Sequence, residues 1–118
     1  MGAKDPSFRD YVMKDVLARV PGVFGRAMFG GWGIYQGERF FGIVFNGRLF
    51  FKVSEETKSA YRERGAEPFS PSPRQTLHSF YEVPPEVLDS PVAAAEWARD
   101  ALKAASSLKK AGRGRPGR

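Results

Sequence analysis

The sequence predicts an α+β fold, a two-layer sandwich in which helices pack on one face of an antiparallel meander sheet. Three observations predict it. Aromatic, β-branched and glycine residues dominate residues 26–53, and Asn46-Gly47 separates two apolar runs within this stretch. Amphipathic helical patterns lie before and after it. Because these patterns are segregated from the strands along the chain, we expect the helices and the sheet to form separate layers.

The first expected element is a helix near the N-terminus. Apolar residues recur at helical spacing over residues 8–20, and Pro21-Gly22 ends the pattern. Either Asp5 or Ser7 can cap this helix, and Pro6 suits the first helical position if Asp5 is the cap.

A meander of strands follows, expected near residues 24–29, 32–36, 39–45 and 48–53. Asn46-Gly47 favours a type I′ hairpin turn, because that turn needs positive φ at both central residues. If these two residues form the loop, Phe45 pairs with Arg48 and Gly42 pairs with Phe51.

This register assigns the side chains to two faces. We expect one face to be core; it carries Phe40, Gly42, Val44, Leu49, Phe51 and Val53. The other face gives the candidate protein interface, which consists of Phe41, Ile43, Phe45, Arg48, Phe50 and Lys52. Arg26 and Arg39 extend its basic rim if they lie on that side.

Two interpretations of the second face remain open. Monomers rarely expose so large a contiguous apolar area, which predicts a homodimer or another protein partner here. The alternative is burial under a helix, because a register slip of one residue exchanges the two faces.

The following segments alternate helix and strand. We expect a short helix over residues 55–64, closed by Gly65. Residues 66–76 contain three prolines and are expected to form a loop, where a central strand cannot lie. Residues 77–83 alternate in polarity and predict a further strand, and residues 85–88 predict a single helical turn.

The last helix has clear boundaries in the sequence. Ser90 is its expected cap, Pro91 occupies its first position, and Gly112 is its expected end. Its buried stripe comprises Ala94, Ala98, Ala101, Leu102, Ala105 and Leu108. Its solvent side comprises Glu96, Arg99, Asp100, Lys103 and Ser107.

Positive charge is concentrated at the C-terminus. The net charge is +6, and five bases lie in residues 109–118, where there is no acid. We therefore expect one nearly neutral domain over residues 1–108 and a disordered basic tail over residues 109–118.

The tail contains Arg113-Gly114-Arg115-Pro116, which matches the core of an AT-hook. An extended Arg-Gly-Arg can lie in the narrow minor groove of A·T-rich DNA, where the negative potential is deepest. The candidate nucleic-acid-binding residues are Lys109, Lys110, Arg113, Gly114, Arg115, Pro116 and Arg118. The alternative interpretation is a solubilising or nonspecific basic tail.

Several kinds of site are not predicted. The chain has no cysteine, which excludes disulfides and thiolate chemistry, and no apolar run approaches the roughly 18 residues of a membrane span. The N-terminus lacks a secretory pattern, so we expect a cytoplasmic protein. His78, the only histidine, lacks metal-ligand spacing, and the glycines at 30, 31 and 33 lack a following Lys-Ser/Thr. We expect no catalytic residues, cofactor or metal, and no enzyme.

One pattern spans most of the chain. It begins at Arg26 with Met-Phe-Gly-Gly, a Gly-aromatic strand, and a hairpin that ends in Arg-Leu-aromatic-x-Lys-Val. It continues with Gly65 before Pro68-Phe69, Tyr81-Glu82-Val83-Pro84 with Glu86, and Trp97-Ala98-Arg99 with Ala101. In this order the segments resemble the N-terminal domain of the TfoX/Sxy competence regulators, over about residues 8–106.

The resemblance implies a two-layer sandwich similar to secretion chaperones, which tends to dimerise. It also implies regulation of competence genes for DNA uptake, alongside the CRP transcription activator, and it supplies no catalytic residues. In full-length regulators a separate C-terminal domain stands where this chain has its basic segment. We therefore expect a non-enzymatic regulatory domain that contacts the transcription machinery while the tail engages DNA. The alternative is a chaperone-like protein-binding adaptor without a DNA role.

Overall fold

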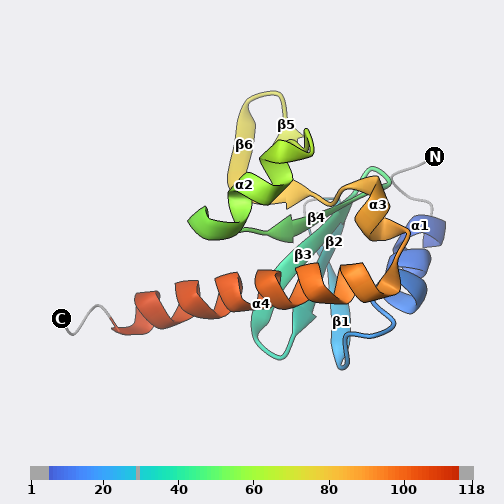
Figure 1. Cartoon of the computed structure of the whole chain (residues 1–118), viewed down its shortest axis with the longest axis horizontal. Coiled ribbons are helices and arrows are strands. Elements are labelled where there is room, and N and C mark those ends of the chain that lie inside the picture. Colours follow the sequence, from blue (N-terminus) through green and yellow to red (C-terminus); the bar gives the residue numbers. More distant parts are fainter. Residues whose placement is uncertain (1–5, 29, 115–118) are drawn as a thin grey trace.

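The computed structural model describes residues 6–28 and 30–114, and the side chains of residues 7–28 and 30–105. Its single antiparallel sheet has the strand order β1-β2-β3-β4-β6-β5. The strands are β1 (Val23–Met28), β2 (Gly31–Gln36), β3 (Arg39–Phe45), β4 (Arg48–Lys52), β5 (Pro68–Ser72) and β6 (Gln75–Glu82). The helices are α1 (Pro6–Tyr11), the π-helix η2 (Val12–Val16), α2 (Glu55–Glu63), α3 (Pro85–Leu88) and α4 (Pro91–Gly114). The predicted α+β fold class is confirmed (Figure 1).

The central hairpin forms as the sequence predicts. Asn46 and Gly47 both have positive φ, of 50° and 72°, which is the conformation that a type I′ turn requires. The β3–β4 register pairs Phe45 with Arg48 and Gly42 with Phe51. The predicted register is therefore confirmed where these two strands pair.

A bulge in β3 changes the assignment of two phenylalanines. Gly42 lies opposite Ile34 on β2, but Tyr35 lies opposite Phe40, so Phe41 is an extra residue in β3. The bulge turns the Phe41 side chain into the main core and the Phe40 side chain onto the other face. The sequence-based assignment of these two residues to the opposite faces is wrong, because alternation does not continue through a bulge.

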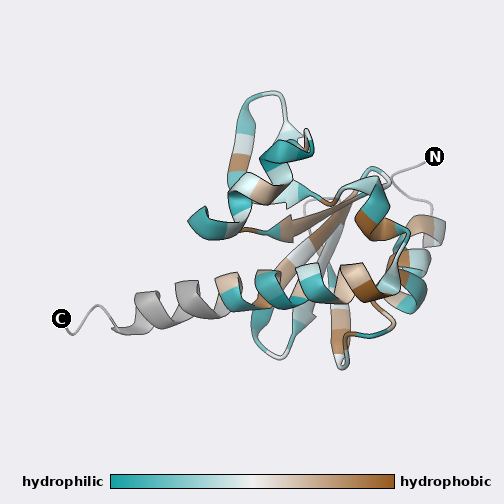
Figure 2. Cartoon of the chain, viewed as in Figure 1, coloured by the Kyte–Doolittle hydropathy of each residue, from teal (hydrophilic) through white to brown (hydrophobic). Residues whose placement is uncertain are grey.

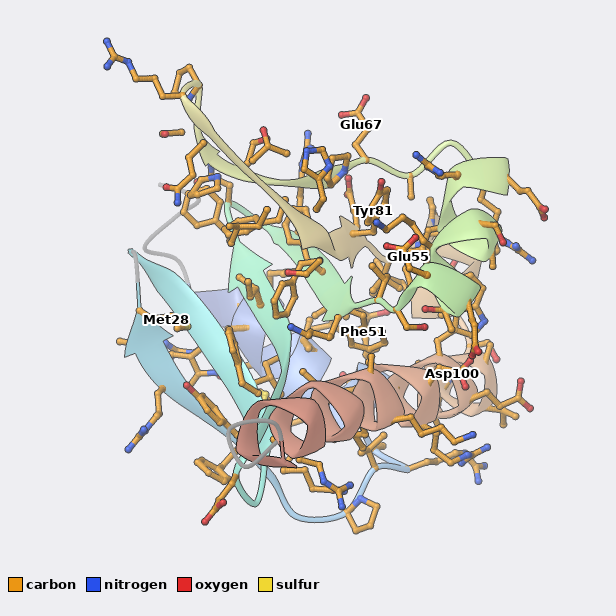
Figure 3. All side chains as sticks on the ribbon, turned by 90° about the vertical axis from the view of Figure 1, so that its left-hand side faces the viewer. Met28, Phe51, Glu55, Glu67, Tyr81 and Asp100 are labelled. Atoms are coloured by element: carbon orange, nitrogen blue, oxygen red, sulfur yellow. The ribbon has the colours of Figure 1, made fainter. Side chains whose placement is uncertain are left out.

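The main core lies between the sheet and the helices, and α4 is its largest cover. The predicted stripe of α4 is buried at Ala94, Ala98, Ala101, Leu102 and Ala105, while the side chain of Leu108 lies outside the described residues. These mostly small side chains let the helix lie close to β3 and β4, and Figure 3 shows Phe51 between the sheet and α4. The predicted cap also forms, since the backbone amide of Ala93 donates to the Ser90 hydroxyl at 3.1 Å.

The second sheet face is covered from within the chain. Phe69 of β5 is fully buried, and its ring centroid lies 4.9 Å from that of Phe50 and 5.3 Å from that of Phe45. In a flat sheet β5 and β3 would be about 14 Å apart, at roughly 4.8 Å per strand. The sheet must therefore curl, which brings the β5–β6 hairpin over this face. The result is a second cluster of buried residues, made of Ile43, Phe50, Phe69 and Phe80.

Strand β5 corrects the expectation of a loop over residues 66–76. Pro68 and Pro71 lie in this strand, which is possible because β5 is at the edge of the sheet and its pairing with β6 is irregular. The prolines correctly exclude a central strand here, but they do not exclude an edge strand.

The first helix is shorter and less regular than its apolar pattern predicts. α1 gives way at residue 12 to the π-helix η2, whose wider turn is seen in the 2.9 Å bond from the Leu17 amide to the Val12 carbonyl. Ser7 lies inside α1 and is not its cap, and Asp5 lies outside the described residues.

The last helix is longer than expected. α4 continues to Gly114, two residues beyond the predicted end at Gly112, and Figure 1 shows it projecting past the sheet. The division into a domain and a tail at residue 109 stays a prediction. Figure 2 shows hydrophobic residues concentrated on the central strands and mixed polarity along α4. Within the described part of the chain, none of the helices combines the length and the apolar character needed to cross a membrane.

The second cluster yields a stability prediction. We expect Phe69→Ala to lower the free energy of unfolding by about 3–5 kcal/mol, because it leaves a cavity between the hairpin and the sheet. Urea unfolding measures this change. Phe24→Ala is the matched control, since Phe24 is 43% exposed and its truncation should cost much less. Equal losses for the two variants would contradict the observed covering of the face.

A buried tyrosine yields a pH prediction. Burial, with a contribution from the Asp100 carboxylate, raises the pKa of the Tyr61 phenol far above its ordinary value. The folded chain then keeps a proton that the unfolded chain releases above about pH 10, so this stabilisation is present below that pH and is lost as the pH rises further.

We expect the free energy of unfolding to fall above about pH 10 by up to about 1.4 kcal/mol per pH unit through this group, and Tyr61→Phe to remove that component. Urea titrations between about pH 9 and 11 on both proteins test this expectation. Lys52, whose pKa is lowered by burial, is present in both, so the difference between the proteins isolates Tyr61. Identical pH slopes would contradict the assignment.

Candidate nucleic-acid interface

An open groove of about 790 Å³ runs beside α4, and we call it the α4 groove. Four segments line it: the turn after η2, the ends of β2 and β3 at their connecting turn, the start of α2 and one side of α4. Val20, Ala95 and Leu102 supply apolar lining. The cations Arg19, Arg39, Arg99 and Lys103 surround it.

Local structure fixes the positions of the groove walls. The side-chain amide of Gln36 donates a 2.8 Å hydrogen bond to the Pro21 carbonyl, which joins the turn after η2 to the end of β2. Arg39 lies opposite Gln36 across a turn in which Gly37 has a φ of 62°. These contacts hold the β2–β3 turn beside the segment that carries Arg19.

The N-terminus of α2 borders the groove and is capped by side chains of the chain itself. Ser54 and Thr57 form a capping box, in which the Thr57 amide donates to the Ser54 hydroxyl at 3.3 Å. The Ser54 amide donates to the Thr57 hydroxyl at 3.0 Å. The capping box therefore occupies the backbone amides of Ser54 and Thr57.

The basic side chains of the groove are exposed and exceed the acids. Glu56 and Asp100 are the two carboxylates in the lining, against four cations. Across the described residues, none of these four cations forms an ion pair with a carboxylate. Exposed cations that outnumber the nearby acids create a positive potential, which attracts polyanions such as nucleic acids.

Helix α4 connects this groove to the basic segment of the sequence. Arg99 and Lys103 are four residues apart on its exposed side, and the helix continues to Gly114. The side chains of the predicted nucleic-acid-binding residues lie outside the described residues: Lys109, Lys110, Arg113, Gly114, Arg115, Pro116 and Arg118. Their DNA contacts stay a prediction.

The predicted protein interface does not form an open surface. Phe41 and Ile43 are fully buried and Phe50 is 6% exposed, while Phe45 is half-buried with its ring against Phe69. The expectation that this face is uncovered is wrong for the three buried residues. Two features bury these residues. The β3 bulge turns Phe41 into the main core, and the β5–β6 hairpin, which was expected to be a loop and a separate strand, covers Ile43 and Phe50.

The two cations of that predicted interface remain partly accessible. Arg48 lies 3.5 Å from the Glu82 carboxylate on β6, with 60% of its side chain exposed. Lys52 is half-buried, and its ammonium lies 5.1 Å from the Phe80 ring centroid. Burial lowers the pKa of Lys52. A homodimer or a protein partner stays a prediction.

Sequence reasoning found part of the α4 groove and missed the rest. The expected solvent side of the last helix includes Arg99 and Lys103, and both are exposed. Arg39, a candidate for the rim of the second face, instead lines this groove with Arg19. Their convergence depends on the tertiary packing of segments 20 residues apart, for which the sequence has no local signal.

The other candidate sites have structural explanations. Gly30 has a φ of 79° in the β1–β2 turn, and the glycines at 31 and 33 lie within β2. His78 is exposed on β6. In the part of the chain that the structure describes, no three His, Asp or Glu side chains gather in a way that could hold a metal ion.

Comparison with known protein families covers the residues that form both the sheet and the α4 groove. The family described as the TfoX N-terminal domain matches residues 15–105, a stretch that contains every strand and all four cations of the α4 groove. Among curated proteins there is no match to this sequence. Because the matched stretch covers well over half of the chain and agrees with the pattern that begins at Arg26, this protein belongs to the TfoX N-terminal domain family.

Proposed function

We propose that this protein is a non-enzymatic regulatory domain that controls the expression of genes for DNA uptake. Its membership of the TfoX N-terminal domain family supports a competence-related regulatory role. In this proposal the domain works by binding other macromolecules: a protein of the transcription machinery, and duplex DNA through α4 and the basic C-terminal segment.

The observation that carries the DNA part is the α4 groove. Arg19, Arg39, Arg99 and Lys103 place four cations around one groove against two carboxylates, and within the described part of the chain none of the four forms an ion pair. α4 leads from this groove toward residues 109–118, which hold five further bases. Phosphates bound along the groove would position the duplex, and the Arg-Gly-Arg segment would reach its minor groove.

The test measures duplex binding as a function of salt. We expect Arg39→Ala/Arg99→Ala/Lys103→Ala to weaken binding to a labelled duplex in fluorescence anisotropy. The slope of log affinity against log salt should become shallower by about 0.9 for each phosphate that the variant no longer neutralises. Deletion of residues 109–118 should weaken binding further and reduce any preference for A·T-rich over G·C-rich duplexes.

A matched control removes the same charge elsewhere. Lys14, Arg62 and Arg74 are exposed and lie outside the groove, so their replacement by alanine should leave the salt slope near that of the parent protein. If the groove variant and the control variant behave alike, the groove has no specific role. Full duplex affinity after both the groove substitutions and the tail deletion would remove DNA from the proposal and favour a protein-binding adaptor.

A further inference from the structure

Three aromatic rings form a row on the sheet face opposite α4, and we call them the aromatic row. They are Phe24 on β1, Tyr35 on β2 and Phe40 on β3. The ring centroids of Phe24 and Tyr35 are 5.6 Å apart with planes 15° apart, and those of Tyr35 and Phe40 are 5.1 Å apart with planes 26° apart. At these separations nearly parallel rings are offset, so each ring overlaps its neighbour only in part.

Backbone geometry sets up this row. Phe24 lies directly opposite Tyr35, and Tyr35 lies directly opposite Phe40 because the bulge at Phe41 shifts the register. Gly33 leaves room for the Met28 side chain beside the rings, since a Cβ there would collide with the Met28 sulfur and lie 3.2 Å from the Phe40 ring.

The row becomes more exposed toward the edge of the sheet. Its inner end rests on Phe80, which is 4% exposed and lies 5.1 Å from Phe40 between ring centroids. Tyr35 and Phe40 are half-buried, and Phe24, on the edge strand β1, is 43% exposed. The core therefore anchors one end of the row and leaves the other end open to solvent.

Cations accompany these rings. The Arg26 guanidinium lies 5.6 Å from the Tyr35 ring centroid, and the Lys52 ammonium lies 5.1 Å from that of Phe80. At the positions on β1 to β4 that share this face, the charged residues are Arg26, Lys52 and Arg48, without an acid among them. Arg48 is paired with Glu82, so Arg26 and Lys52 supply the uncompensated positive charge.

We propose that the aromatic row binds single-stranded nucleic acid. An unpaired base stacks on the face of Phe24 that is turned away from Tyr35, at the open end of the row, and Arg26 and Lys52 contact the phosphates. Rings combined with cations suit this ligand because every base has a face that can stack and every nucleotide carries a negative charge. An uncharged apolar partner would leave both cations without a counter-charge. The row and the α4 groove lie on opposite faces of the sheet, so this site is separate from the proposed duplex contacts.

The test uses the full chain and a labelled 12-nucleotide oligothymidylate in fluorescence anisotropy at low salt. We expect Phe24→Leu, which keeps an apolar side chain but removes the ring, to weaken binding roughly 5- to 100-fold. Phe24→Tyr should retain binding. Arg26→Gln should make the salt slope shallower by about 0.7, the value for one phosphate contact on a single strand.

Tyr11→Leu is the matched control, because Tyr11 is another exposed ring, 39% accessible, but lies on α1. It should bind like the parent protein, and circular dichroism should show that all variants are folded. If Phe24→Leu fails to fold, the comparison rests on Phe24→Tyr and Arg26→Gln. Duplex affinity should be the same for Phe24→Leu and the parent, which separates this site from the α4 groove.

Two results would overturn the inference. One is equal oligothymidylate affinity for Phe24→Leu, Tyr11→Leu and the parent protein, or no binding by any of them at low salt. The other is a parent protein that is dimeric by light scattering and becomes monomeric in Phe24→Leu without any change in oligonucleotide affinity. In that case the row is an interface between two copies of the chain.

Discussion

The bulge at Phe41 sets the arrangement on both sides of the sheet. By adding one residue to β3 opposite β2, it directs Phe41 toward α4 and Phe40 away from it. A bulge also increases the local twist of the strands, and strong twist allows a sheet to curl. The curl of the sheet brings Phe69 of β5 onto Phe45 and Phe50. The bulge thus places Phe41 in the main core and Phe40 at the inner end of the aromatic row, while the pairing of β5 with β6 has irregularities of its own beside Phe69.

The chain uses its two sheet faces differently. On the first face the helices bury a continuous apolar core, and four cations gather where α4 meets the turn after η2 and the ends of β2 and β3. On the second face there is no helix among the elements in contact with the cluster, and a hairpin of the same sheet covers part of it. This leaves rings at β1 and β2 partly exposed beside Arg26. Cations outnumber acids on both surfaces, but the α4 groove has no aromatic residue among the described residues that line it, whereas the other surface combines cations with aromatic rings.

Local signals in the sequence predicted much of the fold. The Asn46-Gly47 turn predicted the four residue pairs between β3 and β4. Ser90-Pro91 predicted the start of α4, and the spacing of its alanines predicted its buried side. These features succeed because each depends on residues close in the sequence. The bulge and strand β5 were missed because each depends on a partner strand: alternation alone cannot show an inserted residue, and prolines are compatible with a strand only at an edge. The α4 groove was predicted only in part. Arg99 and Lys103 lie on one helix, so their shared exposed side follows from local spacing, whereas Arg19 and Arg39 approach them only in the folded chain.

The two edges of the sheet differ in one further respect. β5 carries Pro68 and Pro71 and pairs irregularly with β6, whereas β1 has no proline and pairs with β2 at six consecutive positions. Prolines at an edge block the addition of another strand, because they cannot donate backbone hydrogen bonds. An edge-to-edge contact between two copies of this protein would therefore form more readily at β1 than at β5. Two molecules joined at β1 would present a proline-containing edge at each end, which disfavours the addition of further strands.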